Sequence, residues 1–289
     1  MIRSTLRIAT ILVVVILIMV YPFLPGQYDA LAFSFSTVVQ LLATVGLLLV
    51  PLGIVWLVYE FWKRGRIDRS LPFENRSYSF AIVSLIVSSL LAILVSLVAA
   101  FGIGMSFGVL TLVLWLYVVS RLIPGLKLMK TAKAEIINPA PFYLILIPLI
   151  LLLFQLTLAA PLTEFSRNRA MANSHEFITD IEAYQDEYGH YPVSLVAMWK
   201  DYYPDVVGVE KYHYLPYGES YNLFFEQPRF LLDNFGTREW VVYNPQDEQR
   251  VYSHTSWFLL LTPEELETSQ GWYDVHDAAS PHWKYFWFD

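Results

Sequence analysis

Cysteine is absent from the 289 residues of this sequence. The absence excludes disulfide bonds, thiolate-bound zinc and a cysteine nucleophile, but it fits either side of a membrane. Histidine is missing from the first 160 residues, which also hold only five of the 26 acidic residues. The chain therefore falls into two parts of different chemical character.

The two parts carry opposite net charges. Residues 1–160 contain eleven Lys and Arg against five Asp and Glu, a net charge of +6, whereas residues 161–289 contain eight against 21, a net charge of −13. Such an asymmetry indicates two different environments. The acidic part lacks the clustered Lys and Arg that phosphate binding requires, which argues against nucleic acid as a partner.

Long apolar runs dominate the first part. Hydrophobic residues make up 56% of the chain, above the roughly 45–50% of ordinary soluble domains. A membrane-spanning helix needs about 20 apolar residues, and we predict five such helices near residues 6–24, 37–62, 80–100, 109–123 and 142–162. The predicted fold is an all-α transmembrane bundle over residues 1–162, followed by a soluble α+β domain over residues 163–289.

Basic residues alternate between the predicted loops. Lys and Arg flank the first run and fill the loops after the second and fourth runs, whereas residues 25–36 and 101–108 contain none. Cytoplasmic loops carry the excess of Lys and Arg in membrane proteins. The pattern predicts a cytoplasmic N-terminus and an extracytoplasmic C-terminal domain.

The first apolar run also fits a cleaved signal peptide, because it has a basic start and is followed by Ala30-Leu31-Ala32, a small-residue cleavage pattern. That pattern begins several residues beyond the end of the run, after Pro22, Pro25 and Asp29. The long gap favours a retained membrane span over a cleaved one.

Two charged residues lie at the predicted cytoplasmic ends of spans, Glu60 and Arg121. Long side chains at such positions reach the headgroup layer, so we interpret both as interfacial anchors. No charged residue lies near the centre of a predicted span, which argues against an ion transporter or an intramembrane protease.

Small residues recur every four positions in the third run, at Ser84, Ser88, Ala92, Ser96 and Ala100. This spacing allows two helix backbones to approach closely. We therefore predict a helix contact face, either within the bundle or with a protein partner or a second copy of the chain.

Residues 163–188 contain neither proline nor glycine, and their apolar positions have helical spacing. We predict one amphipathic helix that continues the fifth span past Pro161, a residue type that kinks helices, and ends at Gly189. Its apolar face is expected to pack on a sheet through Ile178, Ile181 and Tyr184. The charged residues on its other side, His175, Glu176, Asp180, Glu182 and Asp186, are interpreted as a solvated surface.

Strand-like alternation follows at residues 219–227, and residues 238–243 and 250–261 are predicted to form a β-hairpin. Short helices are expected to begin at Ser194 and Thr262. The C-terminal HWKYFWF segment (282–288) is expected to form a strand covered on both faces. Membrane-interface docking is the alternative for its aromatic residues.

The segment FITDIEAYQDEYGHYPVSLVAM (177–198) resembles type IV pilins and the pseudopilins of type II secretion. The resemblance covers about residues 142–252 and is sharpest over Tyr184–Leu195. It implies a long helix packed on an antiparallel sheet, in a bacterial inner-membrane protein. The chain departs from the family, because residues 142–147 lack the early acidic residue and no glycine cleavage site precedes them. A permanently tethered pilin-like domain is therefore expected, not a processed pilin.

No motif of a hydrolase, nucleotide-binding protein or zinc protease occurs, so no catalytic or cofactor-binding residue is assigned and no cofactor is expected. The candidate metal ligands near the C-terminus have suitable side chains without a standard spacing; they are Asp274, His276, Asp277 and His282. Asp247 and Glu248 are candidate calcium ligands, as the pseudopilin resemblance implies, although calcium takes six to eight oxygens.

Two functional hypotheses follow. The first is a non-enzymatic membrane protein whose extracytoplasmic domain serves protein interaction or assembly. The second is a membrane-anchored enzyme or sensor with a site in the acidic domain, which would be marked by a buried titratable group in a concave pocket.

Overall fold

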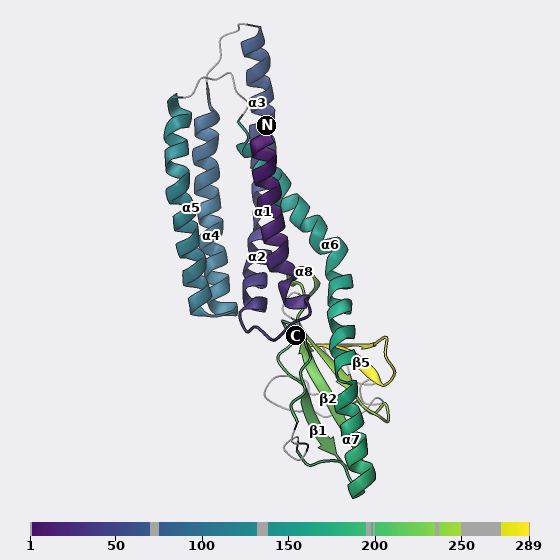
Figure 1. Cartoon of the computed structure of the whole chain (residues 1–289). Helices are drawn as coiled ribbons and strands as arrows, with labels where there is room; N and C mark the ends of the chain where they lie inside the picture. Colours follow the sequence, from purple (N-terminus) through teal and green to yellow (C-terminus); the bar gives the residue numbers. More distant parts are fainter. Residues whose placement is uncertain are drawn as a thin grey trace. The chain divides into compact units, whose positions relative to one another are not determined.

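A computed structural model describes residues 2–69, 75–131, 138–194, 198, 200–234, 237–249 and 273–288 (Figure 1). The chain divides into two compact units. The helical unit comprises Met1–Met19 and Ser34–Leu156, and the C-terminal unit comprises Val20–Phe33 and Thr157–Asp289. The sequence-based division at residue 162 assigned residues 20–33 to the membrane part, whereas the structure includes them in the C-terminal unit.

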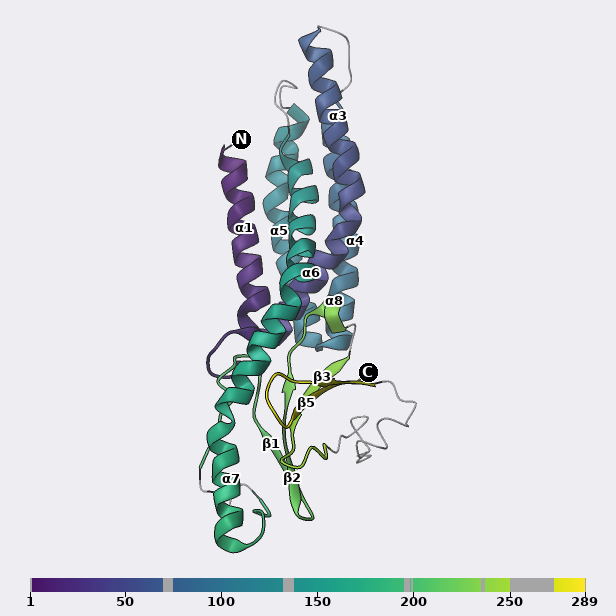
Figure 2. The ribbon, with the colours of Figure 1, turned by 90° about the vertical axis from the view of Figure 1, so that its right-hand side faces the viewer.

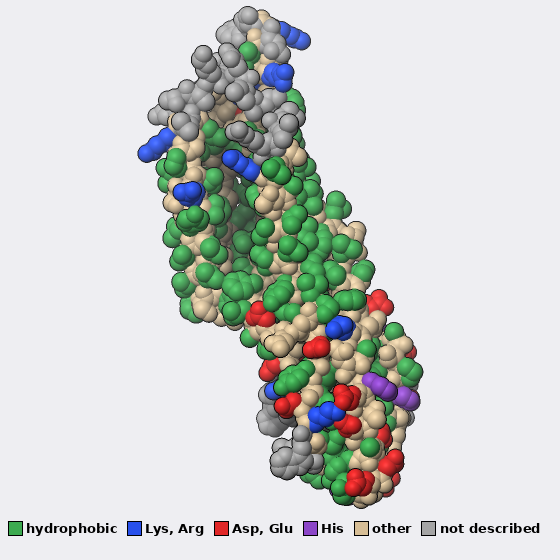
Figure 3. Space-filling model, viewed as in Figure 1, with side chains coloured by type: hydrophobic (Ala, Val, Ile, Leu, Met, Phe, Trp, Pro, Cys, Tyr) green, Lys and Arg blue, Asp and Glu red, His purple; other side chains and the backbone are tan. Residues whose placement is uncertain are grey.

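Among the described residues, five helical segments are long and apolar enough to cross a membrane, which confirms the five predicted spans as helices. They contain α1 (Ile2–Val20), α2 (Ala32–Gly46) with α3 (Val50–Asp68), α4 (Ser77–Gly102), α5 (Met105–Thr131) and α6 (Ala140–Asn173). A short 3-10 turn over Leu47–Leu49 joins α2 to α3 in one helical stretch. Hydrophobic side chains cover the helical unit in Figure 3, and Asp and Glu side chains gather over the C-terminal unit.

The small-residue face of α4 is largely used inside the chain. Ser84, Ala92 and Ser96 are buried, and the Ser96 hydroxyl donates a hydrogen bond to the Gly108 carbonyl of α5 at 2.6 Å. Ser88 is half-buried and bonds its own helix at the Ser84 carbonyl, while a side chain at Gly108 would collide with Ala100. The predicted helix contact is therefore the α4–α5 hairpin, and contact of this face with a second chain stays a prediction.

The predicted helix over residues 163–188 is interrupted once. α6 continues past Pro161 to Asn173, and α7 (His175–Tyr188) begins after Ser174. The Ser174 hydroxyl donates to the Met171 carbonyl at 2.7 Å, so a side chain competes for a helical acceptor. Gly189 ends α7 as predicted, because its φ of 75° lies in the left-handed region that glycine adopts without strain.

The described strands form one antiparallel sheet of order β1-β2-β3-β5-β4. Its members are β1 (His213–Tyr217), β2 (Ser220–Gln227), β3 (Arg238–Tyr243), β4 (Tyr273–Asp277) and β5 (Trp283–Phe288). The strands expected at 219–227, 238–243 and near the C-terminus are confirmed. β1 was missed because it contains Pro216, which an edge strand tolerates.

The predicted hairpin between residues 238–243 and 250–261 is wrong. β3 pairs with β2 along one edge and with β5 along the other, so neither edge is left for another strand. Residues 250–261 and the helix expected at Thr262–Leu266 lie outside the described residues, as do most of those expected in the helix after Ser194.

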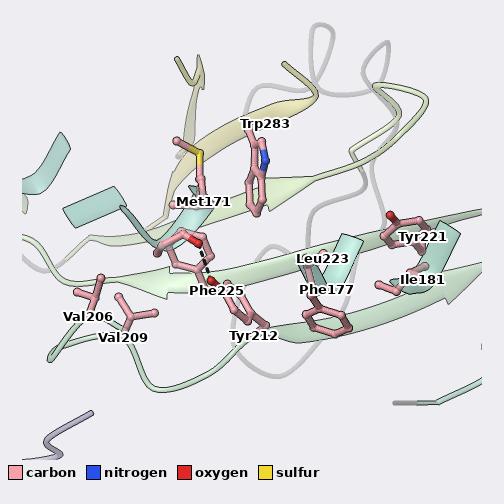
Figure 4. Close-up of a cluster of buried hydrophobic side chains, with 12 residues drawn as sticks. Met171, Phe177, Ile181, Val206, Val209, Tyr212, Tyr221, Leu223, Phe225 and Trp283 are labelled. Carbon is pink, nitrogen blue, oxygen red and sulfur yellow. Dashed lines mark hydrogen bonds between the residues drawn. The ribbon is translucent and has the colours of Figure 1, made fainter. Parts of the chain in front are cut away.

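The core of the C-terminal unit lies between α7 and the sheet (Figures 2 and 4). Ile181 and Phe177 are buried there with Leu223 and Phe225 of β2, and Ile178 packs against the same cluster. Packing of Ile178 and Ile181 is thus confirmed, whereas the Tyr184 ring contacts the rings of Tyr188 and His190. Trp283 of β5 belongs to this cluster, and Phe286 is buried with Val242 in a second one, which favours core packing for both rings.

Replacing Ile181 by aspartate is expected to unfold the C-terminal unit, because Ile181 is fully buried. Burial of an unpaired charge costs roughly 3 kcal/mol or more, a large share of a domain's stability. Limited proteolysis of the full-length protein in membranes measures the effect. Asp186→Ala, on the exposed side of α7, is the control and should leave digestion unchanged; equal digestion rates of the two variants would contradict the packing.

Candidate functional site

A buried polar layer crosses one face of the sheet in the C-terminal unit. Gln227, Glu239 and Trp287 are successive neighbours on β2, β3 and β5. Directly opposite residues of antiparallel strands project to the same face, so the three side chains form a row. Helix α6 meets this row through Ser166, which accepts a hydrogen bond from the Gln227 amide at 2.9 Å, and through Arg167.

Glu239 is the centre of this layer and only 1% of its surface is exposed. Its carboxylate accepts a hydrogen bond from Arg167 Nε at 2.7 Å and another from the Trp287 indole at 2.8 Å. Arg229 Nε lies 3.6 Å from the second carboxylate oxygen. One carboxylate therefore faces two buried guanidinium groups.

The two guanidinium groups also lie over aromatic rings of β5. Arg167 lies 3.7 Å from the centre of the Tyr285 ring, and Arg229 lies 4.1 Å from a Trp287 ring. Arg229 further contacts the Asp233 carboxylate at 3.2 Å. Two cations thus meet two carboxylates and two π faces, so the charges of the layer are compensated internally.

One buried acceptor of this layer, Gln227 Oε1, has no hydrogen-bond partner among the described residues. Arg229 Nε makes no hydrogen bond there either, but it forms an ion pair with Glu239 at 3.6 Å. Unpaired buried atoms are rare, and each costs about 1–3 kcal/mol. Gln227 Oε1 is therefore the acceptor of this layer that a small polar molecule or a water would satisfy.

The charged face of α7 is less solvated than predicted. Asp180 accepts hydrogen bonds from the Tyr202 hydroxyl at 2.5 Å and from Lys200 at 3.1 Å, and these contacts lower the pKa of Asp180. Glu182 accepts a hydrogen bond from the Tyr221 hydroxyl at 2.9 Å. Burial and the neighbouring Glu182 raise the pKa of Tyr191 to about 12. Asp180 and Glu182 therefore fasten α7 to the rest of the unit, while His175, Glu176 and Asp186 are exposed.

Among the candidate metal ligands with described side chains, the structure brings together His282 and Asp247. His282 Nδ1 lies 3.1 Å from Asp247 Oδ1. His276 of β4 instead packs against the rings of Tyr285 and Trp287. Among the described side chains no group of three or more His, Asp or Glu residues is arranged to hold a metal, and this includes Asp247, Glu248, His276, Asp277 and His282. The side chain of Asp274 lies outside the described residues.

The helical unit contains a second buried ion pair, at Glu60. The prediction that Glu60 is an interfacial anchor is wrong, because its side chain is fully buried. Its carboxylate lies 2.5 Å from Lys63 Nζ and accepts hydrogen bonds from Ser77 at 2.5 Å and Trp56 at 3.1 Å. The Asn138 backbone N–H also donates to it, so Glu60 joins α3, α4 and the start of α6. Arg121 is exposed, and its role as an interfacial anchor stays a prediction.

Sequence reasoning missed both clusters because their members are distant in the chain. Arg167 and Glu239 are 72 positions apart, and Glu60 and Asn138 are 78 apart. The available signal was local: an arginine directly after an apolar helix and a glutamate within a strand pattern. Neither identifies its partner.

Comparison of this chain with family models, curated proteins and solved structures gives no match. The pilin-like interpretation therefore rests on the residues around Tyr184–Leu195 and stays a prediction.

Glu239→Gln is expected to destabilise the C-terminal unit by about 3–5 kcal/mol, because it removes the charge that compensates Arg167 and Arg229. The measurement is the thermal unfolding or protease resistance of the purified full-length protein. Glu226→Gln is the matched control: Glu226 faces Arg238 at 3.8 Å with both side chains about half exposed, and such pairs contribute less than about 1 kcal/mol. Equal losses in the two variants would show that the layer is not held by Glu239.

Proposed function

We propose that this chain is a non-enzymatic integral membrane protein whose extracytoplasmic C-terminal unit binds a protein partner or takes part in an assembly. The observation that supports the proposal is the distribution of charged residues between the interior and the surface of the unit. The interior cations Arg167 and Arg229 are compensated by Glu239 and Asp233, whereas the unit's excess of acidic residues lies largely on its surface (Figure 3). The interior charges thus stabilise the fold, and the negative surface charges are available to bind a basic surface of a partner.

The orientation is supported by two independent observations. The basic residues lie in the loops after the second and fourth spans. Residues 20–33, which connect the end of the first span to the start of the second, fold as part of the C-terminal unit, which follows the fifth. Four spans separate these two segments, and an even number returns the chain to the same side of the membrane.

The pilin-like character of the unit is part of the same proposal. Packing of α7 on an antiparallel sheet supports it. Four membrane helices precede α6 and its first turns lack an acidic residue, so we propose a tethered relative of pilins that does not polymerise by processing. A bacterial inner membrane is the corresponding location.

A second candidate, a sensor or enzyme site in the C-terminal unit, is favoured by the buried Gln227 Oε1 of the Glu239 layer, which has no hydrogen-bond partner among the described residues. A small polar molecule bound there would raise the thermal stability of the native protein and leave the Glu239→Gln variant unchanged.

The proposed orientation predicts which single cysteines an impermeant thiol reagent reaches in intact cells. The chain has no native cysteine, so Gln27→Cys, Gly65→Cys and Glu187→Cys each introduce a unique target at an exposed position. A side chain at Gly65 meets no atom within 4 Å, so this variant is expected to fold. We expect labelling at 27 and 187 in intact cells and at 65 only after lysis. The reverse pattern would refute the orientation.

The proposed interaction is tested by photocrosslinking in native membranes. The most exposed large hydrophobic side chains of the C-terminal unit in the described ranges are Val193 at 82%, Tyr203 at 66% and Tyr188 at 55%, and such residues mark protein contacts when they cluster. A photoreactive residue at each position should give a protein adduct that weakens at high salt. Leu114 of α5, 54% exposed, is the lipid-facing control. Absence of adducts at all three positions would contradict an interaction role.

A further inference from the structure

The segment Pro22–Asp29, between α1 and α2, is bound along its backbone by the C-terminal unit. Pro25 forms an antiparallel bridge with Val206. Four backbone hydrogen bonds flank this bridge: Gly208 N to Pro22 O at 2.7 Å, Val207 N to Leu24 O at 3.0 Å, Gly26 N to Asp205 O at 3.0 Å and Asp29 N to Val207 O at 2.9 Å. We call Pro22–Asp29 the strap.

One aromatic side chain anchors the strap. Phe23 is fully buried, and its ring stacks on Phe230 with centroids 4.5 Å apart and planes only 6° from parallel. Gly208 allows the backbones to approach, because a Cβ there would lie 2.7 Å from the Pro22 carbonyl oxygen and 3.0 Å from Pro22 Cβ. Main-chain pairing and one aromatic pocket are how proteins bind extended peptides.

We propose that the surface formed by Asp205–Val209 and Phe230 is a docking site for an extended peptide and that the chain's own strap is its ligand. The C-terminal unit completes its fold only when this ligand is bound. The membrane span before the strap is therefore retained in the mature protein.

The geometry around the alternative cleavage site agrees with this proposal. Ala32 is almost fully buried and opens α2, and its N–H donates to the Asp29 carbonyl at 3.1 Å. The Leu31 N–H donates to the Asp29 carboxylate at 2.9 Å. Cleavage at Ala32 would separate the strap from α2, which these two hydrogen bonds join to Asp29.

The strap also has almost no free chain at either end. α1 ends at Val20, a 3-10 turn over Tyr21–Phe23 follows at once, and α2 begins three residues after Asp29. Little free chain therefore lies between the strap and either helix.

The proposal is tested in the full-length protein in native membranes. Phe23→Ala should speed proteolysis of the C-terminal unit at least tenfold, because removal of a buried phenylalanine side chain is among the costliest core changes. Tyr21→Ala is the matched control: Tyr21 is the neighbouring aromatic on the same turn and is 43% exposed, so its rate should change less than about twofold.

A disulfide distinguishes strap docking from a general folding defect. Pro25→Cys with Val206→Cys places two thiols on directly bridged residues, which lie within reach of a disulfide. We expect this bond to form on mild oxidation and to restore protease resistance to Phe23→Ala. Pro25→Cys with Glu219→Cys, at the turn between β1 and β2, should not form one.

Three outcomes would overturn the proposal: equal proteolysis of Phe23→Ala and Tyr21→Ala, failure of the 25–206 pair to crosslink in the otherwise native chain, or loss of an N-terminal tag from the mature membrane protein. The crosslink and the tag remain informative even where Phe23→Ala does not fold. None of these results depends on the partner adducts that test the proposed function.

Discussion

The carboxylate of Glu239 is the interaction on which the C-terminal unit most depends. It draws Arg167 of α6, Arg229 after β2 and the Trp287 indole of β5 to a single strand, β3. A buried arginine without a counter-charge would cost more free energy than most single core contacts supply. The buried charge of Glu239 therefore connects α6, the sheet and its C-terminal strand β5. The apolar core around Ile181 and Phe225 packs next to this charge. The helical unit follows the same rule on a smaller scale at Glu60, where Lys63 compensates the charge.

Features with a local cause were predictable from the sequence. The five spans follow from apolar length, the end of α7 follows from Gly189, and β2, β3 and β5 follow from alternating apolar residues. Ile178 and Ile181 were assigned correctly because helical spacing alone defines their face. Each of these features depends on residues within about one turn or one strand of each other.

Features that depend on distant residues were not predictable. Glu60 appeared to be an anchor because its partner Ser77 and the Asn138 N–H lie in other segments. The sequence predicts that the strand at residues 238–243 pairs with the next strand-like segment, residues 250–261. In the structure this strand, β3, pairs with β5, which begins at Trp283. Asp180 and Glu182 appeared solvated because Tyr202 and Tyr221 follow them only later in the chain. The Glu239 layer was not predictable for the same reason, because no two of its charged side chains belong to the same helix or strand.

The strap sets an order of events during synthesis of the protein. Pro25 and its bridge partner Val206 are 181 positions apart, and ribosomes add about 5–20 residues per second. The strap is therefore made on the order of ten seconds before the surface that receives it. During that interval the second to fifth spans emerge, while Phe23 and the strap backbone have no partner in the C-terminal unit. Folding of this unit must consequently be late and must close a very long loop, which slows the search for native contacts. A chain truncated before β2 would leave the strap without the Phe230 ring and exposed to quality-control proteases.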